Sequence, residues 1–282
     1  MALAKLCILT PALGYEERWQ GEGAPLDALF GDQLTYRCWA DTGDLADFDL
    51  ILPLLAWGYP RHAARWYATL DAWEAAALPF ANPLATLRWN TDKDYLLDLQ
   101  AAGVAIVETL EAHNLCAADL EAARSQFGSS ILVVKPSISG GADGTYKLGP
   151  NDPIPFDVLE REMLIQPMMP SIADEGEFSL FYFGGSLSHA ILKRPAAGDF
   201  RVQEQYGGHE VSVKAPSAGR MLAQAALAAA PAPPLYARVD MVRDGQGAFR
   251  LMELELIEPS LFLAHAPDGG AMLAEAVRAR LG

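Results

Sequence analysis

The stretch YARVDMVRDGQGAFRLMELELIEPS, residues 236–260, decides the fold. Two runs of β-forming residues flank the tetrapeptide Asp244-Gly245-Gln246-Gly247, whose glycines can adopt the positive φ angles of a tight turn. This pattern predicts an antiparallel hairpin. One face of the hairpin is expected to be apolar and to cover a core, and it is formed by Ala237, Val239, Met241, Met252, Leu254 and Leu256.

Acidic residues gather on the other face of the predicted hairpin. The turn favours a register in which Arg243 pairs with Ala248. Glu253 then lies diagonally beside Asp240, and Glu255 follows two residues further along the same face. Like charges this close repel unless a cation lies between them, and oxygen ligands favour Mg²⁺ over zinc. The three carboxylates therefore predict a Mg²⁺ site, and the alternative is a solvated strand face without a metal.

The composition is that of an ordinary globular protein. The chain has 282 residues, 51% of them hydrophobic and 20% charged, which suffices for a large core in two or three lobes. Its formal net charge is −15, and no basic cluster offers a footprint for nucleic acid or anionic lipid, so we expect neither as a partner. The odd number and wide spacing of the cysteines favour reduced thiols and a cytoplasmic location, and these residues are Cys7, Cys38 and Cys116.

The first 85 residues alternate β-like runs with helical patterns. The runs are residues 5–10, 34–39 and 48–55, and the clearest helix is 62–77. We expect a small, open, mainly parallel α/β lobe, in which ligands bind beyond the carboxyl ends of the strands. Residues 10–15 and Trp57-Gly58-Tyr59 are therefore candidates for a pocket rim, the alternative being packing within the core. The apolar N-terminus is interpreted as a first strand rather than a signal peptide.

Lys93 is a first candidate for binding phosphate. Asn90 or Thr91 is expected to cap a helix that ends at Gly103, which places Lys93 in its first turn. The helix dipole disfavours a cation there, so the lysine is better explained if an anion also binds. The alternative is a surface lysine that pairs with a neighbouring aspartate.

Lys135 is a second candidate. The apolar run 130–136 predicts a buried strand that ends in this lysine and enters a glycine-rich loop, residues 137–145. A buried lysine costs free energy unless an anion meets it, and the backbone around Gly140 and Gly141 could close over phosphates. The loop is not a Walker A motif, because no Gly-Lys-Ser/Thr follows.

The remaining motifs follow in order. A short strand at 164–168 ends in Gln166-Pro167-Met168, and a hairpin that opens at Glu177 turns at Gly184-Gly185 and ends at Lys193 and Arg194. A long loop containing Arg201 then leads to a helix at about 218–229, between two prolines.

Together these residues resemble the ordered motifs of the ATP-grasp superfamily. The motifs are Lys93 ahead of a helix, Lys135 before a glycine-rich loop, the Gln166-Pro167 hinge, Gly176-Glu177-Phe178-Ser179, Arg201, and Arg238-Val-Asp240 with Glu253-Leu-Glu255. The similarity covers roughly residues 85–265 and is specific in combination, whereas each motif alone is weak. Within the superfamily the chain is similar to the glutathione-synthetase and RimK-like carboxylate–amine ligases, and among these to the D-cycloserine-ligase type.

The resemblance implies a fold and its cofactors. The fold is ATP-grasp, an α/β fold built of α+β lobes. A pre-ATP-grasp lobe, 1–85, is expected to precede an ATP-grasp domain, 86–282, whose two lobes cover roughly 86–165 and 166–282. The implied cofactors are ATP and one or two Mg²⁺ ions, with Mn²⁺ as the alternative metal. A homodimer is kept open beside the monomer.

The resemblance also implies a role for each motif residue. The nucleotide residues are Lys93 and Lys135 at the phosphates, Gly140 and Gly141 in the lid, Gln166, Pro167 and Met168 at the adenine, and Glu177 at the ribose. Asp240, Glu253 and Glu255 would hold the metal, while Arg238, Lys193 and Arg201 would neutralise the transferred phosphoryl group or bind the substrate carboxylate. The commonest superfamily pattern has Asn at the position of Glu255, which makes its share in metal binding the least certain.

The implied reaction is an ATP-dependent ligation of a carboxylate and an amine. The carboxylate of a small amino-acid-like or peptide substrate attacks the γ-phosphorus, and the amine then displaces phosphate from the acyl phosphate. A closing lid protects this intermediate from water. If both groups belong to one molecule, the product is a ring, as in cycloserine formation. The alternatives are a small-molecule kinase with a hydroxyl acceptor and a non-catalytic nucleotide-binding module.

Overall fold

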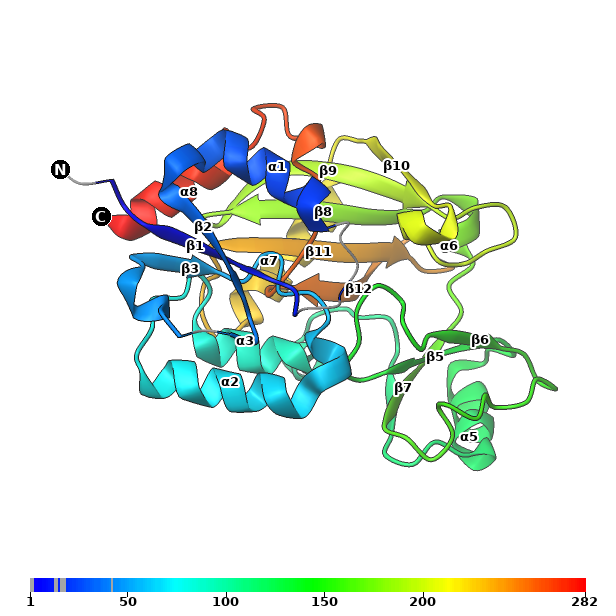
Figure 1. Ribbon diagram of the computed structural model, residues 1–282. Helices are drawn as coiled ribbons and strands as arrows, with labels where there is room; N and C mark the ends of the chain where they lie inside the picture. Colours follow the sequence, from blue (N-terminus) through cyan, green and yellow to red (C-terminus); the bar gives the residue numbers. More distant parts are fainter. Residues whose placement is uncertain (1–2, 13–14, 16–18, 42) are drawn as a thin grey trace.

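The computed structural model describes residues 3–12, 15, 19–41 and 43–282, and its strands form three separate sheets (Figure 1). The N-terminal sheet is wholly parallel, in the order β2-β1-β3, as the sequence predicts. Its strands are β1 (Leu6–Thr10), β2 (Leu34–Cys38) and β3 (Leu50–Leu52), and its helices are α1 (Trp19–Phe30) and α2 (Ala63–Ala75). Residues 13 and 14 of the predicted pocket rim lie outside the described residues.

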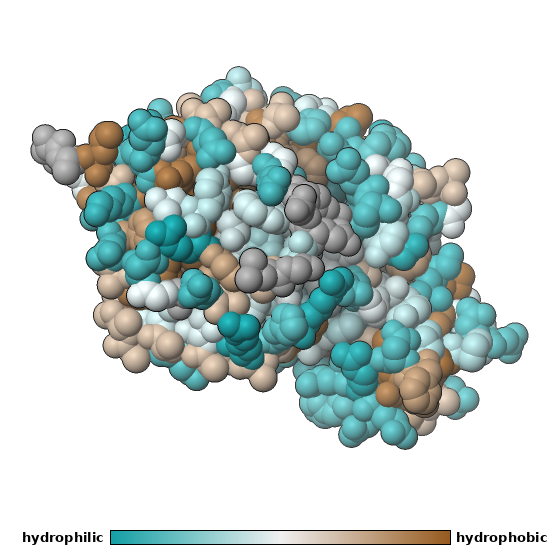
Figure 2. Space-filling view, in the orientation of Figure 1, coloured by the Kyte–Doolittle hydropathy of each residue, from teal (hydrophilic) through white to brown (hydrophobic). Residues whose placement is uncertain are grey.

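A small antiparallel sheet forms a second lobe, with strand order β4-β7-β5-β6. Its strands are β4 (Leu110–Ala112), β5 (Leu132–Pro136), β6 (Tyr146–Leu148) and β7 (Met163–Pro167). Helix α5 (Ala117–Phe127) packs on this sheet and closes a small core of its own. In the space-filling view this lobe projects from the body of the molecule, and an indentation separates the two (Figure 2).

The third sheet is the largest, antiparallel in the order β10-β9-β8-β11-β12. Its strands are β8 (Glu177–Phe183), β9 (Ser186–Arg194), β10 (His209–Ser212), β11 (Tyr236–Arg243) and β12 (Phe249–Glu255). Gly184 and Gly185 both have positive φ and form the predicted turn between β8 and β9. Helices α4 (Tyr95–Ala101) and α7 (Ser217–Ala229) cover one face of the sheet.

The opposite face of the large sheet is apolar along one half of its strands and charged along the other half. Phe181, Phe183 and Tyr236 pack against the N-terminal lobe and against α8 (Ala271–Leu281), so this half is apolar core. The N-terminal lobe does not cover the other half, where polar and charged side chains continue the same alternation. Figure 1 shows this half at the end of the large sheet nearer to the small lobe, and it positions the site described below.

The hairpin of β11 and β12 is antiparallel, but the predicted register is wrong. Arg243 pairs with Phe249 rather than Ala248, and the register shifts between Asp240 and Met241. An extra residue in β12 at this bulge places Asp240 directly opposite Glu253 instead of diagonally.

The bulge also corrects the predicted apolar face. Met252 does not join the main core but packs beside Val242 and Ile172, in a separate cluster. Leu251 takes its place in the core next to Leu254. One extra residue reverses the side on which every later side chain lies, which is why simple alternation fails here.

The predicted helix cap at Asn90 or Thr91 is also wrong. Both residues end helix α3 (Leu84–Thr91), and the next helix begins only at Tyr95. The buried Asn90 amide instead donates to the Leu254 carbonyl at 2.8 Å and accepts from the Leu256 N–H at 2.8 Å. Its side chain thus satisfies backbone groups at the end of β12, where burial makes unpaired groups costly.

Helix α6 (Ser171–Asp174) completes the described elements. Among the described residues, no helix is both long enough and apolar enough to cross a bilayer.

Candidate active site

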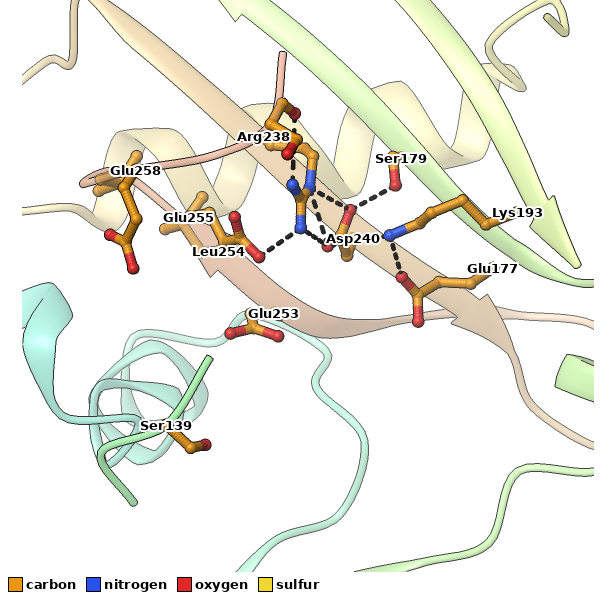
Figure 3. Close-up of polar contacts among 12 residues, drawn as sticks. Ser139, Glu177, Ser179, Lys193, Arg238, Asp240, Glu253, Leu254, Glu255 and Glu258 are labelled. Atoms are coloured by element: carbon orange, nitrogen blue, oxygen red, sulfur yellow. Dashed lines mark hydrogen bonds and ion pairs between the residues drawn. The ribbon is translucent and has the colours of Figure 1, made fainter. Parts of the chain in front are cut away.

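Charged side chains from three neighbouring strands meet on the charged half of this face of the large sheet (Figure 3). Lys193 on β9 lies 2.5 Å from a carboxylate oxygen of Glu177 on β8 and 3.4 Å from one of Asp240 on β11. The Ser179 hydroxyl, also on β8, donates to Asp240. Because alternate residues of a strand share a face, β8 presents Glu177 and Ser179 together to this group.

Arg238 ties this group to the hairpin partner strand. Its Nε donates to both oxygens of Asp240 at 3.1 Å, and its Nη2 contacts Asp240 at 3.0 Å and also Glu255. Its Nη1 donates to the Ser260 carbonyl at 3.3 Å. The planar guanidinium is suited to such forked contacts with carboxylates, and its position is therefore fixed from three sides.

Two lysines approach from the direction of the small lobe. Lys93, between α3 and α4, lies 3.1 Å from Glu253 and also donates to the Ser139 carbonyl. Lys135 at the end of β5 is buried, and this desolvation lowers the pKa of its ammonium to about 8, to which the charge of Lys93 contributes. Glu253 thus lies between these two lysines and the other carboxylates of the site, Asp240 and Glu255.

Burial and pairing separate the pKa values of the carboxylates. Burial alone would raise the pKa of Asp240, but Arg238 and Lys193 hold it at about 2. Burial raises the pKa of Glu255 to about 7, because the neighbouring acids add to burial and Arg238 only partly opposes them. Asp240 is therefore the more acidic of the two carboxyl groups, because it pairs with two cations and Glu255 with one.

Asp240, Glu253 and Glu255 could hold a metal ion together. Each offers a carboxylate oxygen, and these oxygens all lie within 4.8 Å of one another. An oxygen-only set of this kind fits a hard divalent cation. The structure thus brings together the three acids that the sequence singled out, although Asp240 and Glu255 also share Arg238.

Comparison with known proteins shows the family to which this chain belongs. No family model matches the sequence. The cycloserine biosynthesis protein DcsG of Streptomyces lavendulae is 30% identical over 268 residues, which are 86% of this chain and 87% of that protein. The chain belongs to the DcsG family of ATP-grasp ligases. It is an ATP-dependent ligase that joins a carboxylate and an amine, as the sequence resemblance implies.

Solved structures agree with this assignment. The crystal structure of D-cycloserine synthetase DcsG matches with a TM-score of 0.80 and 25% identity, over 98% of this chain and 99% of that one. D-alanine–D-alanine ligase from Bacillus anthracis complexed with ATP matches with a TM-score of 0.70 at 18% identity, over 99% of both chains. At that identity the second match shows the fold alone, and it confirms the ATP-grasp architecture. ATP-grasp ligases use ATP and a divalent metal.

The glycine-rich loop of this ATP-grasp ligase is contacted by two other segments of the chain. Gln205 Nε2 donates to the Gly141 carbonyl at 3.0 Å. On the other side Arg61 of the N-terminal lobe lies 3.2 Å from Asp143 in an exposed ion pair. Three segments far apart in the sequence therefore meet above the lysines.

The hinge residues at the end of β7 lie beside an apolar cluster. The buried Gln166 amide donates to the Thr109 hydroxyl at 2.9 Å, so its side chain is already engaged. The N–H of Met168 donates to the Ile131 carbonyl at 3.0 Å. The apolar cluster next to the hinge consists of Val107, Met169, Ile172, Val202 and Val242, with Met252 packed against it.

Arg201 is the predicted site residue that the structure does not join to the cluster. Its guanidinium lies 2.8 Å from Asp199 and 3.7 Å from the ring centroid of Tyr206, all within one loop. Within the described part of the chain, its ion pair is this local one.

Sequence reasoning assigned no role to two residues of this site, Ser179 and Glu258. Ser179 could have been found, because it lies two residues after Glu177 on the same strand and must share its face. Glu258 lies beyond the end of β12 and precedes Pro259. The alternation of side chains along a strand therefore does not predict which way it faces. Burial and the charge of Glu255 raise its pKa to about 8.

Proposed function

We propose that this ligase activates the carboxylate of a small amino acid as an acyl phosphate and closes a ring by attack of an amine of the same molecule, giving a cycloserine-type product. The observation that carries this proposal is the cluster of four buried cations around three carboxylates that could hold a metal ion, in a chain related to a cycloserine biosynthesis protein. The cations are Lys93, Lys135, Lys193 and Arg238.

The first step joins two anions, a carboxylate and a triphosphate. Charge neutralisation and positioning therefore dominate catalysis. Lys193 and Arg238, held by Asp240, would face the substrate carboxylate and the transferred phosphoryl group. A divalent metal at Asp240, Glu253 and Glu255 would neutralise phosphate charge when bound. We propose Mg²⁺, one ion or two, with Mn²⁺ as a substitute.

The nucleotide would lie between the small lobe and the large sheet. Its phosphates would meet Lys93 and Lys135, and the loop around Gly140 and Gly141 would cover them. The adenine would contact the backbone at Pro167 and Met168 together with the apolar cluster, while the engaged Gln166 side chain shapes the pocket wall.

Two predicted roles are revised by the contacts. Glu177, expected at the ribose, has Lys193 as its ion-pair partner, which supports a role in orienting that cation. Arg201, expected at the phosphoryl group, would reach it only if its loop moved away from Asp199. We retain a role in the site for both residues as a proposal.

Hydroxylamine tests the proposed chemistry, because it traps an acyl phosphate as a hydroxamate. With ATP, β-aminooxy-D-alanine and the parent protein, we expect ADP and free phosphate in equal amounts, together with cycloserine. Adding hydroxylamine should divert the carboxyl group into a hydroxamate. ADP formation with phosphate retained on the acceptor, and no hydroxamate, would establish the kinase alternative instead.

We also propose a cellular location, a domain division and an oligomeric state. The free thiols of Cys7, Cys38 and Cys116 support a cytoplasmic location. The separate sheets support a division near residue 85 and another near 165. A homodimer is the oligomeric state we would test first, by light scattering, and we expect no nucleic-acid partner at a net charge of −15.

A further inference from the structure

Glu258 lies at the end of the site away from Lys193, beside Glu255 (Figure 3). The N-terminal lobe holds it at two points. Trp57 Nε1 donates to the Glu258 carbonyl at 3.0 Å, and the Tyr59 hydroxyl lies beside its side-chain carboxyl group. The half-buried carboxyl group therefore has a fixed position relative to the N-terminal lobe.

Tyr59 is itself rigidly placed. It begins a short 3₁₀ helix, is 4% exposed, and stacks on Trp66 with ring centroids 4.4 Å apart. Gly58 before it has a φ of +85°, and a Cβ there would lie 2.7 Å from the Tyr15 ring. Only glycine fits this turn, so the backbone delivers the tyrosine hydroxyl to Glu258 in one orientation.

The charges around Glu258 are unbalanced. The charges of Glu255 and Glu253 raise the pKa of Glu258 and that of Lys93 lowers it, but Lys93 is paired with Glu253 at 3.1 Å. Within the described residues, Glu258 forms no ion pair, and it is not one of the three acids whose oxygens lie within 4.8 Å of one another. A carboxyl group in this position has no ion-pair partner of its own among the described residues, and a bound cationic group can supply one.

A ligase that joins a carboxylate and an amine must bind an amine-bearing substrate on this face. We infer that Glu258 and Tyr59 form the subsite for the ammonium group of an α-amino-acid substrate, whose carboxylate faces Arg238 and Lys193. This inference rests on the proposed function and specifies its substrate class. A carboxylic acid without the ammonium group leaves Glu258 unpaired, so the subsite selects amino acids over their deamino counterparts.

The same segment of the N-terminal lobe also meets the lid. Pro60 lies 4.0 Å from the position of a Cβ on Gly140, and Arg61 pairs with Asp143. The ammonium subsite is therefore enclosed when the lid is closed. Enclosure strengthens the charge pair, because it removes competing water.

The test compares two substrates that differ only in the ammonium group, β-aminooxy-D-alanine and 3-(aminooxy)propionate, in the hydroxamate assay with ATP. For Glu258→Gln we expect kcat/KM for the amino acid to fall by about 30-fold, the effect of losing about 2 kcal/mol from a charge pair. The fall should come mainly from KM. The deamino compound and the KM for ATP should change by less than about twofold, within the usual range for a residue outside the nucleotide contacts.

Three further variants separate recognition from structure. Glu258→Asp keeps the charge and should retain part of the preference, and Tyr59→Phe should lower it by about fivefold, as expected for the loss of one ordinary hydrogen bond. Glu121→Gln on the exposed face of α5 is the matched control and should change nothing. If Glu258→Gln does not fold, Tyr59→Phe carries the test.

The outcomes distinguish the two levels of the proposal. A Glu258→Gln variant with the parental preference for the amino acid, or one that loses kcat equally for both compounds, overturns the ammonium subsite alone. A parent that forms neither hydroxamate nor phosphate with any amino acid in a full panel overturns the proposed function and the subsite with it.

Discussion

The two halves of one face of the large sheet differ in what completes them. In the apolar half, Phe181 and Tyr236 are fully buried by the N-terminal lobe and α8. In the charged half, two residues further along the same strands, Ser179 and Arg238 face the site instead. The alternation of the strands is identical, but apolar side chains of the N-terminal lobe and α8 complete one half, whereas charged side chains that pair with one another complete the other. Breaking either half should therefore have a different consequence.

The largest expected effect is on stability, from the apolar half. Phe181→Ala should lower the free energy of unfolding by about 3–5 kcal/mol, because it removes a fully buried ring and leaves a cavity. The ring stacks on His189 with centroids 4.2 Å apart. Urea denaturation measures the loss, while ATP affinity at a folded temperature should stay parental. A loss below about 1 kcal/mol would show that this half is not the core we describe.

The next effect is on turnover, from the charged half. Asp240→Asn should reduce kcat/KM by about 100- to 1000-fold, since it removes the ionised carboxylate that orients both cations and faces the metal. Stability should change less than in Phe181→Ala, because Lys193 keeps Glu177 and Arg238 keeps Glu255 as partners. Steady-state ADP release at saturating Mg²⁺ is the measurement, and Glu255→Gln should lose less. Parental turnover in Asp240→Asn would remove the basis for the metal assignment.

The smallest expected effect is the pH dependence of ATP affinity, which also tests the charged half. Burial lowers the pKa of Lys135 to about 8 in the free protein, and bound phosphate favours its charged form. ATP affinity should therefore be highest below pH 8 and fall about tenfold by pH 9, where binding must first restore the proton.

Calorimetry at both pH values checks this sign. Lys135→Ala is the control, because it should bind ATP more weakly than the parent at pH 7 and show no such decline toward pH 9. Equal affinity of parent and variant at pH 7 would contradict the phosphate assignment of Lys135.

The sequence predicted features that depend on neighbouring residues, and it did not predict those that depend on contacts between distant segments. The hairpins, the parallel N-terminal sheet and the position of Lys135 at a strand end were predictable, because periodicity and turn glycines act over a few residues. The convergence of Asp240, Glu253 and Glu255 was predictable for the same reason. Arg201 shows the limit, since its motif position was clear but its local pairing with Asp199 was not.

By itself, the sequence determined which residues form strands, where the chain turns and which side chains share a face, since these depend on near neighbours. Tertiary structure alone decided the bulge that turned Met252 away from the core, because that residue packs on segments distant in the chain. It also decided that Asn90 serves β12, across 164 residues, rather than capping a helix. Burial makes an unpaired backbone group costly, and only the folded neighbours determine which groups are buried together. Glu258 belongs to the same class, because its donors come from a lobe 201 residues away in the chain.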